Sequence, residues 1–378
     1  MQKHSIARAV SGARWNPRDG LIGGDQGLWL DPSDLTTMFQ DSAGTTPVTA
    51  VEQSVGLIRD KSGRNNHAFQ STSANRPTLS ARYNLLTKTE QFDDAAWTKI
   101  GLKSFGSGSI SNAIAAPDGN TTADFICEDT SSSNHSVAYN LGTSQVNISY
   151  SASIAIRKFP HANSRRWAYV TLLIGNNALK AFRYILNIDL QAGNVTGSQV
   201  GLELSNTSYT ITTEGDYWRI ALTASGPSTA TFYIVCGASN SATPTYNSTY
   251  GDVEYTGDGT SGIYVWGASV VPAGQSSLPY QRVNTATDYD SDATKFPRRI
   301  NYAAGQSMTV SFPANLGSSC VVARANPGVN AVIAENQTVN TPLTLNTNHS
   351  GLVITSRAIS VDEKARLDEY LDKKAIAK

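Results

Sequence analysis

Turn signals recur along this chain about every eight to twelve residues from Gly27 onward, between short runs of alternating or β-branched residues. Such spacing is typical of β-sandwiches and β-barrels. In the run at 217–225, Trp218, Ile220 and Leu222 share one face, which predicts a strand with one buried face. The expected fold is therefore all-β, with further strands at Val146–Phe159, Arg165–Gly175, Ala230–Ala238 and Gly262–Val271.

One helix is predicted, at the C-terminal end of the sequence. Ser360 followed by Glu363 has the spacing of a capping box, in which each residue bonds the backbone of the other. Leu367, Tyr370 and Leu371 then form an apolar stripe that needs an apolar partner. The preceding run GLVITSRAI predicts the final strand on which this helix docks.

Composition limits the class of protein. The 378 residues carry 30 basic and 30 acidic side chains, so no strong field favours nucleic acid or anionic membrane. Charged residues make up 16%, below the roughly 25% of ordinary domains, and Ser, Thr, Asn and Gly take their place. No apolar run is long enough to insert into a membrane. The three cysteines, Cys127, Cys236 and Cys320, are too far apart for a metal motif and are expected to be buried free thiols.

The stretch RDKSGRNNHAFQ at 59–70 places Asp60, Ser62 and His67 close together in sequence. A serine triad would need these side chains to converge with an oxyanion motif, and none accompanies them. Glycine for a positive φ and Asn or Asp for side-chain to backbone bonds are what a tight turn requires. We therefore expect a turn and predict no catalytic residues.

Metal and cofactor sites are not predicted. Asp288, Asp290 and Asp292 resemble the start of a calcium loop, but Ala293 and Arg299 stand where an EF-hand needs glycine and glutamate. These acids are expected to form a solvated linker, with a looser structural calcium site as the open alternative. The five histidines are scattered without metal-binding spacing.

Aromatic residues are the remaining indication of a binding site, because Trp and Tyr rings pack on sugar faces while polar neighbours bind the hydroxyls. Trp97, Trp218 and Trp266 are expected in the core. The candidate ligand-binding residues are Arg165, Arg166, Trp167 and Tyr169, with an ordinary strand edge as the alternative interpretation.

Three stretches in the N-terminal part carry a family resemblance: Trp29–Leu35, Phe39–Val51 and Asp60–Ala68. In this order they resemble the start of the concanavalin-like, LamG-type sandwich of tailed-phage and prophage tail proteins. The resemblance covers Gly27–Leu79 and implies a β-sandwich without catalytic residues.

A second resemblance lies in the middle of the chain. It is to the jelly-roll, carbohydrate-binding-module-like domain of phage tail proteins, and this chain departs from it at Ser269 and Val271, where that family usually has Gln and Glu. The stretches that carry it are Arg82–Leu102, Ala116–Ile126 and Ile263–Val283.

Together the two resemblances imply a domain organisation. Residues 27–83 plus 286–378 are expected to form a split concanavalin-like sandwich, and residues 84–285 an inserted jelly roll. The basic, glycine-punctuated sequence of residues 1–26 separately predicts an N-terminal docking arm. Thr285–Tyr302 resembles the segment through which the chain of that family returns from the inserted domain to the outer sandwich. A separate small C-terminal domain is the competing interpretation.

The function expected from these resemblances is that of a non-enzymatic bacteriophage virion protein, tail-fibre-like or receptor-binding, whose jelly roll contacts a host-surface glycan. The expected location is the virion, and the expected partners are other virion proteins, bound through the arm, and copies of this chain, with a trimer favoured by family analogy. A structural virion protein without glycan binding, such as a head decoration, collar or tail connector, is the alternative. A polysaccharide depolymerase is a third class.

Overall fold

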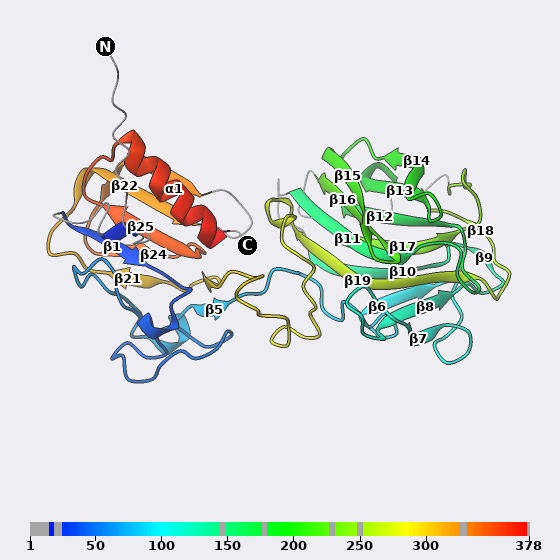
Figure 1. Cartoon of the computed structure of the whole chain (residues 1–378), viewed down its shortest axis with the longest axis horizontal. Helices are drawn as coiled ribbons and strands as arrows, with labels where there is room; N and C mark the ends of the chain where they lie inside the picture. The colour runs from blue at the N-terminus through cyan, green and yellow to red at the C-terminus, as the bar shows by residue number, and fades with distance from the viewer. Residues whose placement is uncertain are drawn as a thin grey trace, which may run out of the picture. The chain divides into compact units, whose positions relative to one another are not determined.

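The computed structural model describes residues 15–18, 25–143, 149–175, 180–226, 231–247, 252–325 and 331–375. The chain forms two compact units (Figure 1). Unit 1 holds the described residues up to Ala81 together with those from Ser291 onward, and unit 2 is Arg82–Asp290. The predicted docking arm, residues 1–26, lies mostly outside the described residues.

Unit 1 is built from antiparallel sheets. The first has the order β1 (Gly27–Leu30), β25 (Gly351–Thr355), β22 (Gly317–Ala325) and β23 (Val332–Val339). The second has the order β2 (Met38–Phe39), β3 (Leu57–Ile58), β4 (Ala68–Phe69), β21 (Met308–Val310) and β24 (Leu343–Leu345). A two-stranded sheet joins β20 (Arg299–Asn301) to β5 (Thr78–Ser80). Each of the three sheets pairs strands from both ends of the chain.

Strand β1 is buried on both faces, and its four residues show why. Leu28 and Leu30 point into the core cluster shared by the two larger sheets, whereas Trp29 points to the opposite face. Along the whole strand β1 pairs with β25, from Gly27 opposite Thr355 to Leu30 opposite Leu352. The apolar faces of both strands therefore match on either side of the sheet.

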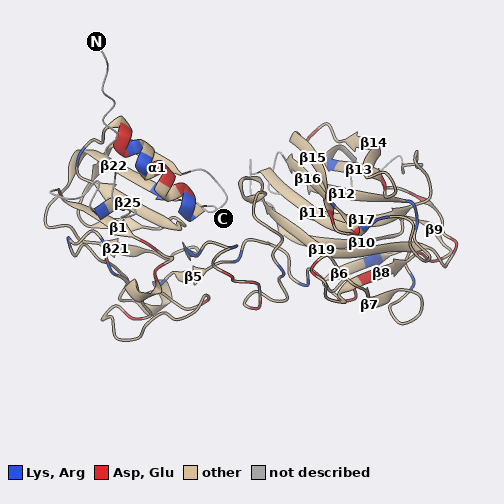
Figure 2. Cartoon of the chain, in the orientation of Figure 1, with Lys and Arg blue, Asp and Glu red and all other residues tan. Residues whose placement is uncertain are grey.

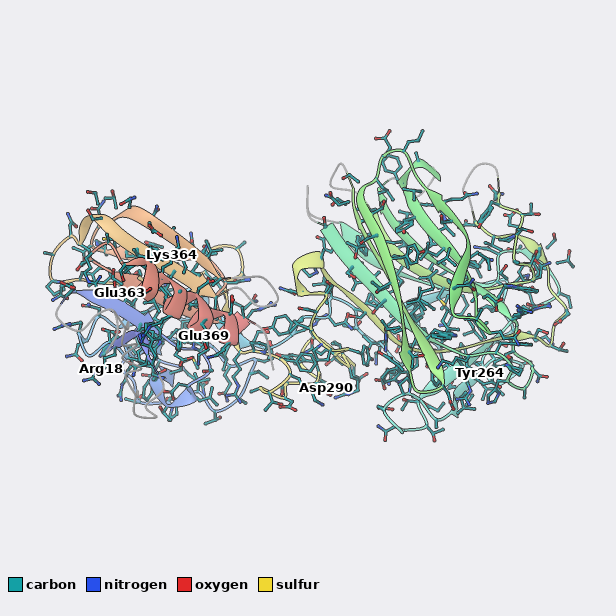
Figure 3. The ribbon with its side chains drawn as sticks, turned by 45° about the horizontal axis from the view of Figure 1, so that its top comes forward. Arg18, Tyr264, Asp290, Glu363, Lys364 and Glu369 are labelled. Atoms are coloured by element: carbon teal, nitrogen blue, oxygen red, sulfur yellow. The ribbon has the colours of Figure 1, made fainter. Side chains whose placement is uncertain are left out.

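Helix α1 (Val361–Ala375) covers the outer face of the first sheet, across β22 and β25 (Figure 1). Its capping box forms as predicted: the Ser360 amide donates to Glu363 over 2.8 Å and the Glu363 amide to Ser360 Oγ over 3.3 Å. Leu367 and Leu371 are buried against Trp29 and Val353. Charged side chains gather along the helix, among them Glu363, Lys364 and Glu369 (Figures 2 and 3).

Unit 2 is a sandwich of two six-stranded antiparallel sheets. One has the order β14 (Asn194–Val200), β13 (Arg183–Asp189), β12 (Trp167–Gly175), β17 (Thr231–Ser239), β10 (Ser136–Thr143) and β6 (Trp97–Ile100). The other has the order β15 (Ser205–Glu214), β16 (Tyr217–Ser225), β11 (Ser149–Arg157), β19 (Gly262–Pro272), β8 (Ala123–Cys127) and β7 (Ile110–Ile114). A short pair adds β18 (Tyr255–Thr256) and β9 (Ser132–Ser133).

The core of unit 2 lies between the inner faces of its two sheets. In β16, Ile220 and Leu222 are fully buried there and Trp218 packs at the margin, as the alternation predicts. The expectation of a single buried face is nevertheless incomplete. Tyr217 is buried on the other face, where it packs against Trp266, because the segment before β8 covers that side of the sheet.

Buried amide side chains join the two ends of unit 2. Asn84, fully buried, donates from Nδ2 to the carbonyls of Ala268 and Gln281 and accepts from the Val270 amide over 3.0 Å. Gln281 Oε1 in turn accepts from the amides of Tyr83 and Asn84. The first residues of the unit are thereby bonded to its last strand and the segment after it.

The prediction of an all-β fold with one C-terminal helix is confirmed for the described residues. The prediction of three buried free cysteines is also confirmed. The family assignment of the two units stays a prediction. No helix of the described residues is long and apolar enough to cross a membrane.

Replacing a buried leucine of α1 tests the docking of the helix. Leu371→Ala is expected to lower the free energy of unfolding of unit 1 by about 2–5 kcal/mol, because it leaves a cavity against β22 and β25. Val361→Ala, at a side chain that is 84% exposed, is the control and should change it by less than about 0.5 kcal/mol. Denaturant titration measures both, and equal effects would contradict the docking.

A fragment of residues 82–290 tests the independence of unit 2. We expect it to unfold in one cooperative transition, because it has its own core and its ends are joined by Asn84 and Gln281. Circular dichroism during thermal denaturation measures this. A fragment without a cooperative transition would show that unit 2 needs the rest of the chain.

Candidate functional site

The turn at 59–70 is organised by hydrogen bonds to Asp60. The Asp60 carboxylate accepts from the Trp29 amide (2.9 Å), from Ser62 Oγ (2.6 Å) and from the Asn66 amide (3.1 Å). His67 Nδ1 accepts from the Asp60 amide over 3.0 Å, and in this fully described segment it has no hydrogen bond to Ser62. The predicted tight turn is thus confirmed, with its serine hydroxyl bonded to the carboxylate.

The two arginines proposed for ligand binding are held in ion pairs. Arg165 bonds the fully buried Glu128 and also reaches Asp258 over 3.0 Å. Arg166 bonds Asp189 over 2.6 Å. Both guanidinium groups are therefore already bound to acids of unit 2.

The two aromatic residues of this stretch are placed differently. Trp167 is half-buried beneath the Arg166 guanidinium, 5.3 Å from its ring centroid. Tyr169 is wholly buried in a cluster with Val253 and Tyr255, because the chain around Val253 covers this face of β12. The structure therefore leaves Trp167 half-buried at the first residue of β12 and buries Tyr169 completely, so that Tyr169 offers no surface to a ligand.

The three tryptophans expected in the core lie in β6, β16 and β19. Trp97 and Trp266 are 1% and 4% exposed, which confirms the prediction for both. Trp218 is half-buried, and its indole Nε1 donates to the Leu190 carbonyl over 2.9 Å.

The acids of the sequence DYDSD bond protein groups. Arg282 bonds Asp288 over 3.4 Å and Asp290 over 3.2 Å, and Asp292 accepts from the Thr294 amide over 2.9 Å. Within the described ranges, no three His, Cys, Asp or Glu side chains are grouped so that they could hold a metal ion.

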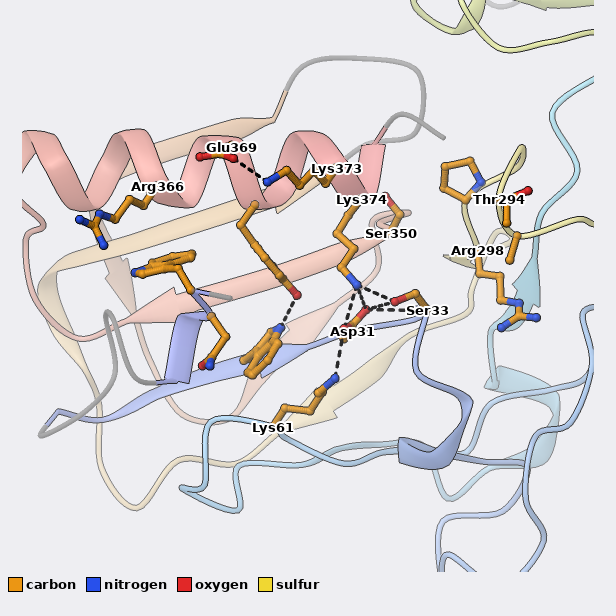
Figure 4. A pocket seen from close by; sticks show the side chains of 16 residues that line it. Asp31, Ser33, Lys61, Thr294, Arg298, Ser350, Arg366, Glu369, Lys373 and Lys374 are labelled. Carbon is orange, nitrogen blue, oxygen red and sulfur yellow. Dashed lines mark hydrogen bonds and ion pairs between the residues drawn. The ribbon is translucent and has the colours of Figure 1, made fainter. Parts of the chain in front are cut away.

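A groove of about 1070 Å³ lies in unit 1, between α1 and the loops that follow β1 and precede β20 (Figure 4). Aromatic and basic side chains dominate its lining. The residues are Trp15, Asn16, Trp29, Asp31, Ser33, Lys61, Ala293, Thr294, Pro297, Arg298, Ser350, Arg366, Glu369, Tyr370, Lys373 and Lys374.

A buried carboxylate lies at the centre of this groove. Asp31, 4% exposed, accepts from Lys374 Nζ over 2.9 and 3.0 Å and from Lys61 Nζ over 3.2 Å. Ser33 Oγ donates to the same carboxylate over 2.6 Å and accepts from Lys374 over 2.6 Å (Figure 4). The cluster joins the segment after β1 to the last turn of α1.

Electrostatics keeps this cluster charged. Burial by itself raises the pKa of Asp31, but the two lysines and the Ser33 hydroxyl outweigh it, so the pKa lies below its usual value. The pKa of Lys61 is raised, since bonds to Asp34 and Asp31 outweigh its desolvation. Asp31 therefore stays ionised and is unsuited to act as a general acid.

Aromatic rings form the wall of the groove beside the cluster. The Trp29 Nε1 donates to the Tyr370 hydroxyl over 2.9 Å, and the two rings meet edge to face at 5.9 Å. Trp15 packs against the other side of Tyr370 at 6.1 Å. Lys61 Nζ lies 4.7 Å from the Trp29 ring centroid, at cation–π distance.

The sequence does not reveal this site, although its parts are visible there. Trp29 and Asp31 belong to the stretch that carries the family resemblance, and Tyr370 belongs to the apolar stripe of the helix. More than 330 residues separate the two groups, and only the pairing of β1 with β25 brings them together. A polar residue between apolar strands, such as Asp31, is the one local signal.

A second, smaller hollow of about 440 Å³ lies in unit 2 and is lined by acids. Among them, Asp124 is 1% exposed and accepts from the amides of Phe92 (2.9 Å) and Asn112 (2.7 Å). Burial raises its pKa to about 7 despite these bonds. Burial also raises the pKa of Glu90, which accepts from the Tyr280 hydroxyl over 3.0 Å.

Comparison with known protein families and with curated proteins gives no match to this chain.

The raised pKa of Asp124 predicts a pH dependence of stability. The unfolded chain ionises this carboxyl near pH 4 and the folded chain near pH 7, so the free energy of unfolding should fall as pH rises through this window. The loss should approach about 4 kcal/mol, at about 1.4 kcal/mol for each pH unit. Denaturant titrations from pH 4 to 8 measure it. Asp124→Asn should abolish this component, and an unchanged pH profile in the variant would contradict the assignment.

Proposed function

We propose that this protein is a non-enzymatic component of a bacteriophage virion, of the tail-fibre or receptor-binding type, and that it contacts a glycan of the host surface. The resemblances of Gly27–Leu79 and of the central domain to phage tail proteins support the setting. The lining of the groove in unit 1 is the main observation that supports glycan binding.

The groove combines the two kinds of group that saccharides need. The rings of Trp15 and Tyr370 are half-buried and line an open hollow, where a pyranose can pack its apolar face. Around them are hydroxyl, amide and charged groups, including Asn16 and Thr294, that can bond sugar hydroxyls. The proposed binding site is therefore the groove of unit 1 and not the stretch Arg165–Tyr169 of the central domain that the sequence predicts.

The ionisable groups of the chain favour binding over hydrolysis. Asp31 is held ionised by two lysines, and Glu369 bonds Lys373 over 2.5 Å. In the groove of unit 1, both lining carboxylates are therefore bound to lysines, whereas the general acid of glycoside hydrolysis is a carboxyl group with a raised pKa.

Several copies acting together would suit this function. Weak single-site binding of a glycan becomes useful when linked copies bind at once. We expect a homo-oligomer, with a trimer favoured by family analogy, attached to other virion proteins through the N-terminal residues that precede Trp15, since Trp15 and Asn16 line the groove.

Replacing Trp15 tests the proposed function. Trp15→Ala should weaken retention of the full chain on immobilised bacterial envelope polysaccharides about tenfold, the loss expected for one stacking ring. Tyr209→Ala removes an aromatic ring that is 49% exposed in unit 2 and should leave retention unchanged. No release of reducing ends is expected. If no polysaccharide retains the wild-type chain, the structural virion role replaces this proposal, and release of reducing ends would favour a depolymerase.

A further inference from the structure

The charge of the groove in unit 1 is unbalanced, although the chain as a whole is neutral. Five basic side chains line it (Lys61, Arg298, Arg366, Lys373 and Lys374) against two acidic ones (Asp31 and Glu369). The difference of five and two leaves a formal excess of three positive charges in a protein whose total is zero. This local excess favours an anion over a neutral ligand.

Each of the three lysines in the lining already forms an ion pair with an acid of unit 1. Lys61 and Lys374 share Asp31, and Lys61 also bonds Asp34 over 2.8 Å. Lys373 bonds Glu369 one turn earlier on α1. With Asp34 counted, the three lysines face three acids, so the two positive charges that remain lie on the two arginines.

The two arginines have no acidic partner among the described residues. Arg366 is exposed on α1. Arg298, just before β20, is half-buried, and its Nε is fully covered without a hydrogen-bond partner in the described structure. Neither arginine is therefore neutralised by an acid of the described structure, and both line the groove, where their guanidinium groups can pair with an anionic ligand.

The positions of the two arginines suit an extended ligand. Figure 4 shows Arg366 at one end of the row of lining residues and Arg298 at the other, with the cluster of Asp31 and its lysines between them. A guanidinium group binds a carboxylate or a phosphate through two parallel hydrogen bonds, which a lysine does not match. Two such groups along one groove fit a polymer that carries an acid at intervals.

We infer that the groove of unit 1 binds an acidic saccharide polymer, bearing carboxylate or phosphate groups, through Arg298 and Arg366. This inference rests on the proposed function and specifies its ligand. The half-buried rings of Trp15 and Tyr370 favour a saccharide over nucleic acid, as does the absence of net charge on the chain.

The test uses the full chain and four immobilised probes: polygalacturonate, its carboxyl-reduced neutral form, poly(glycerol phosphate) and double-stranded DNA. We expect binding to one or both acidic glycans, at least tenfold weaker binding to the neutral form, and weaker binding at higher salt. Polygalacturonate and poly(glycerol phosphate) distinguish a carboxylate from a phosphate ligand.

Three variants locate the binding. Arg298→Gln and Arg366→Gln should each weaken binding about tenfold, the usual worth of one charge-assisted hydrogen bond. Arg59→Gln is the matched control, because Arg59 is an exposed arginine of unit 1 that stacks on Phe39 outside the groove. Arg366 is exposed on the helix surface, so its variant keeps the test valid even if Arg298→Gln fails to fold.

The outcomes separate this inference from the proposed function. Three outcomes would overturn the inference of an acidic ligand. They are binding of the neutral glycan as strong as that of the acidic form, a loss of binding in Arg59→Gln as large as in the groove variants, and binding of DNA as strong as that of the acidic glycans. Retention on neutral polysaccharides with loss in Trp15→Ala would keep the proposed function while the inference fails. Absence of binding to every glycan would overturn both.

Discussion

The pairing of β1 with β25 is the contact on which the architecture of unit 1 depends. It joins Gly27–Leu30 to the strand Gly351–Thr355 and completes a sheet whose two faces are both covered. Because successive residues of a strand point to opposite sides, the same four residues contribute to the core cluster between the sheets and to the contact with α1. The register places Trp29 under the helix, and Asp31 therefore comes within reach of Lys374.

In both units, buried polar residues link segments of the chain that are distant in sequence. In unit 1, Asp60 bonds the amide of Trp29 and so links the turn at 59–70 to β1. In unit 2, Asn84 bonds the carbonyls of Ala268 and Gln281. Each offers several bonds to backbone groups that would otherwise be buried without partners. These directional hydrogen bonds fix the relative position of segments that are distant in sequence, which non-directional apolar contacts do not.

Burial has opposite consequences for two carboxyl groups of the protein. Asp31 is buried beside two lysines, so its charged form is favoured. Asp124 is equally buried but bonds neutral backbone amides, and its pKa rises to about 7. The first arrangement suits a fixed ion pair that shapes a binding groove. The second makes the stability of unit 2 depend on pH.

The sequence by itself determined the fold class, the capped C-terminal helix and the turn around Asp60, because alternation, capping and turn chemistry act between residues a few positions apart. It did not determine which exposed-looking residues are available to a ligand. Tyr169 follows the strand pattern, yet the chain around Val253 covers it. The groove was decided only by the tertiary structure, because its lining comes from segments more than 330 residues apart, such as Asp31 and Lys374. A pairing over that distance depends on the register of β1 and β25, which no local pattern encodes.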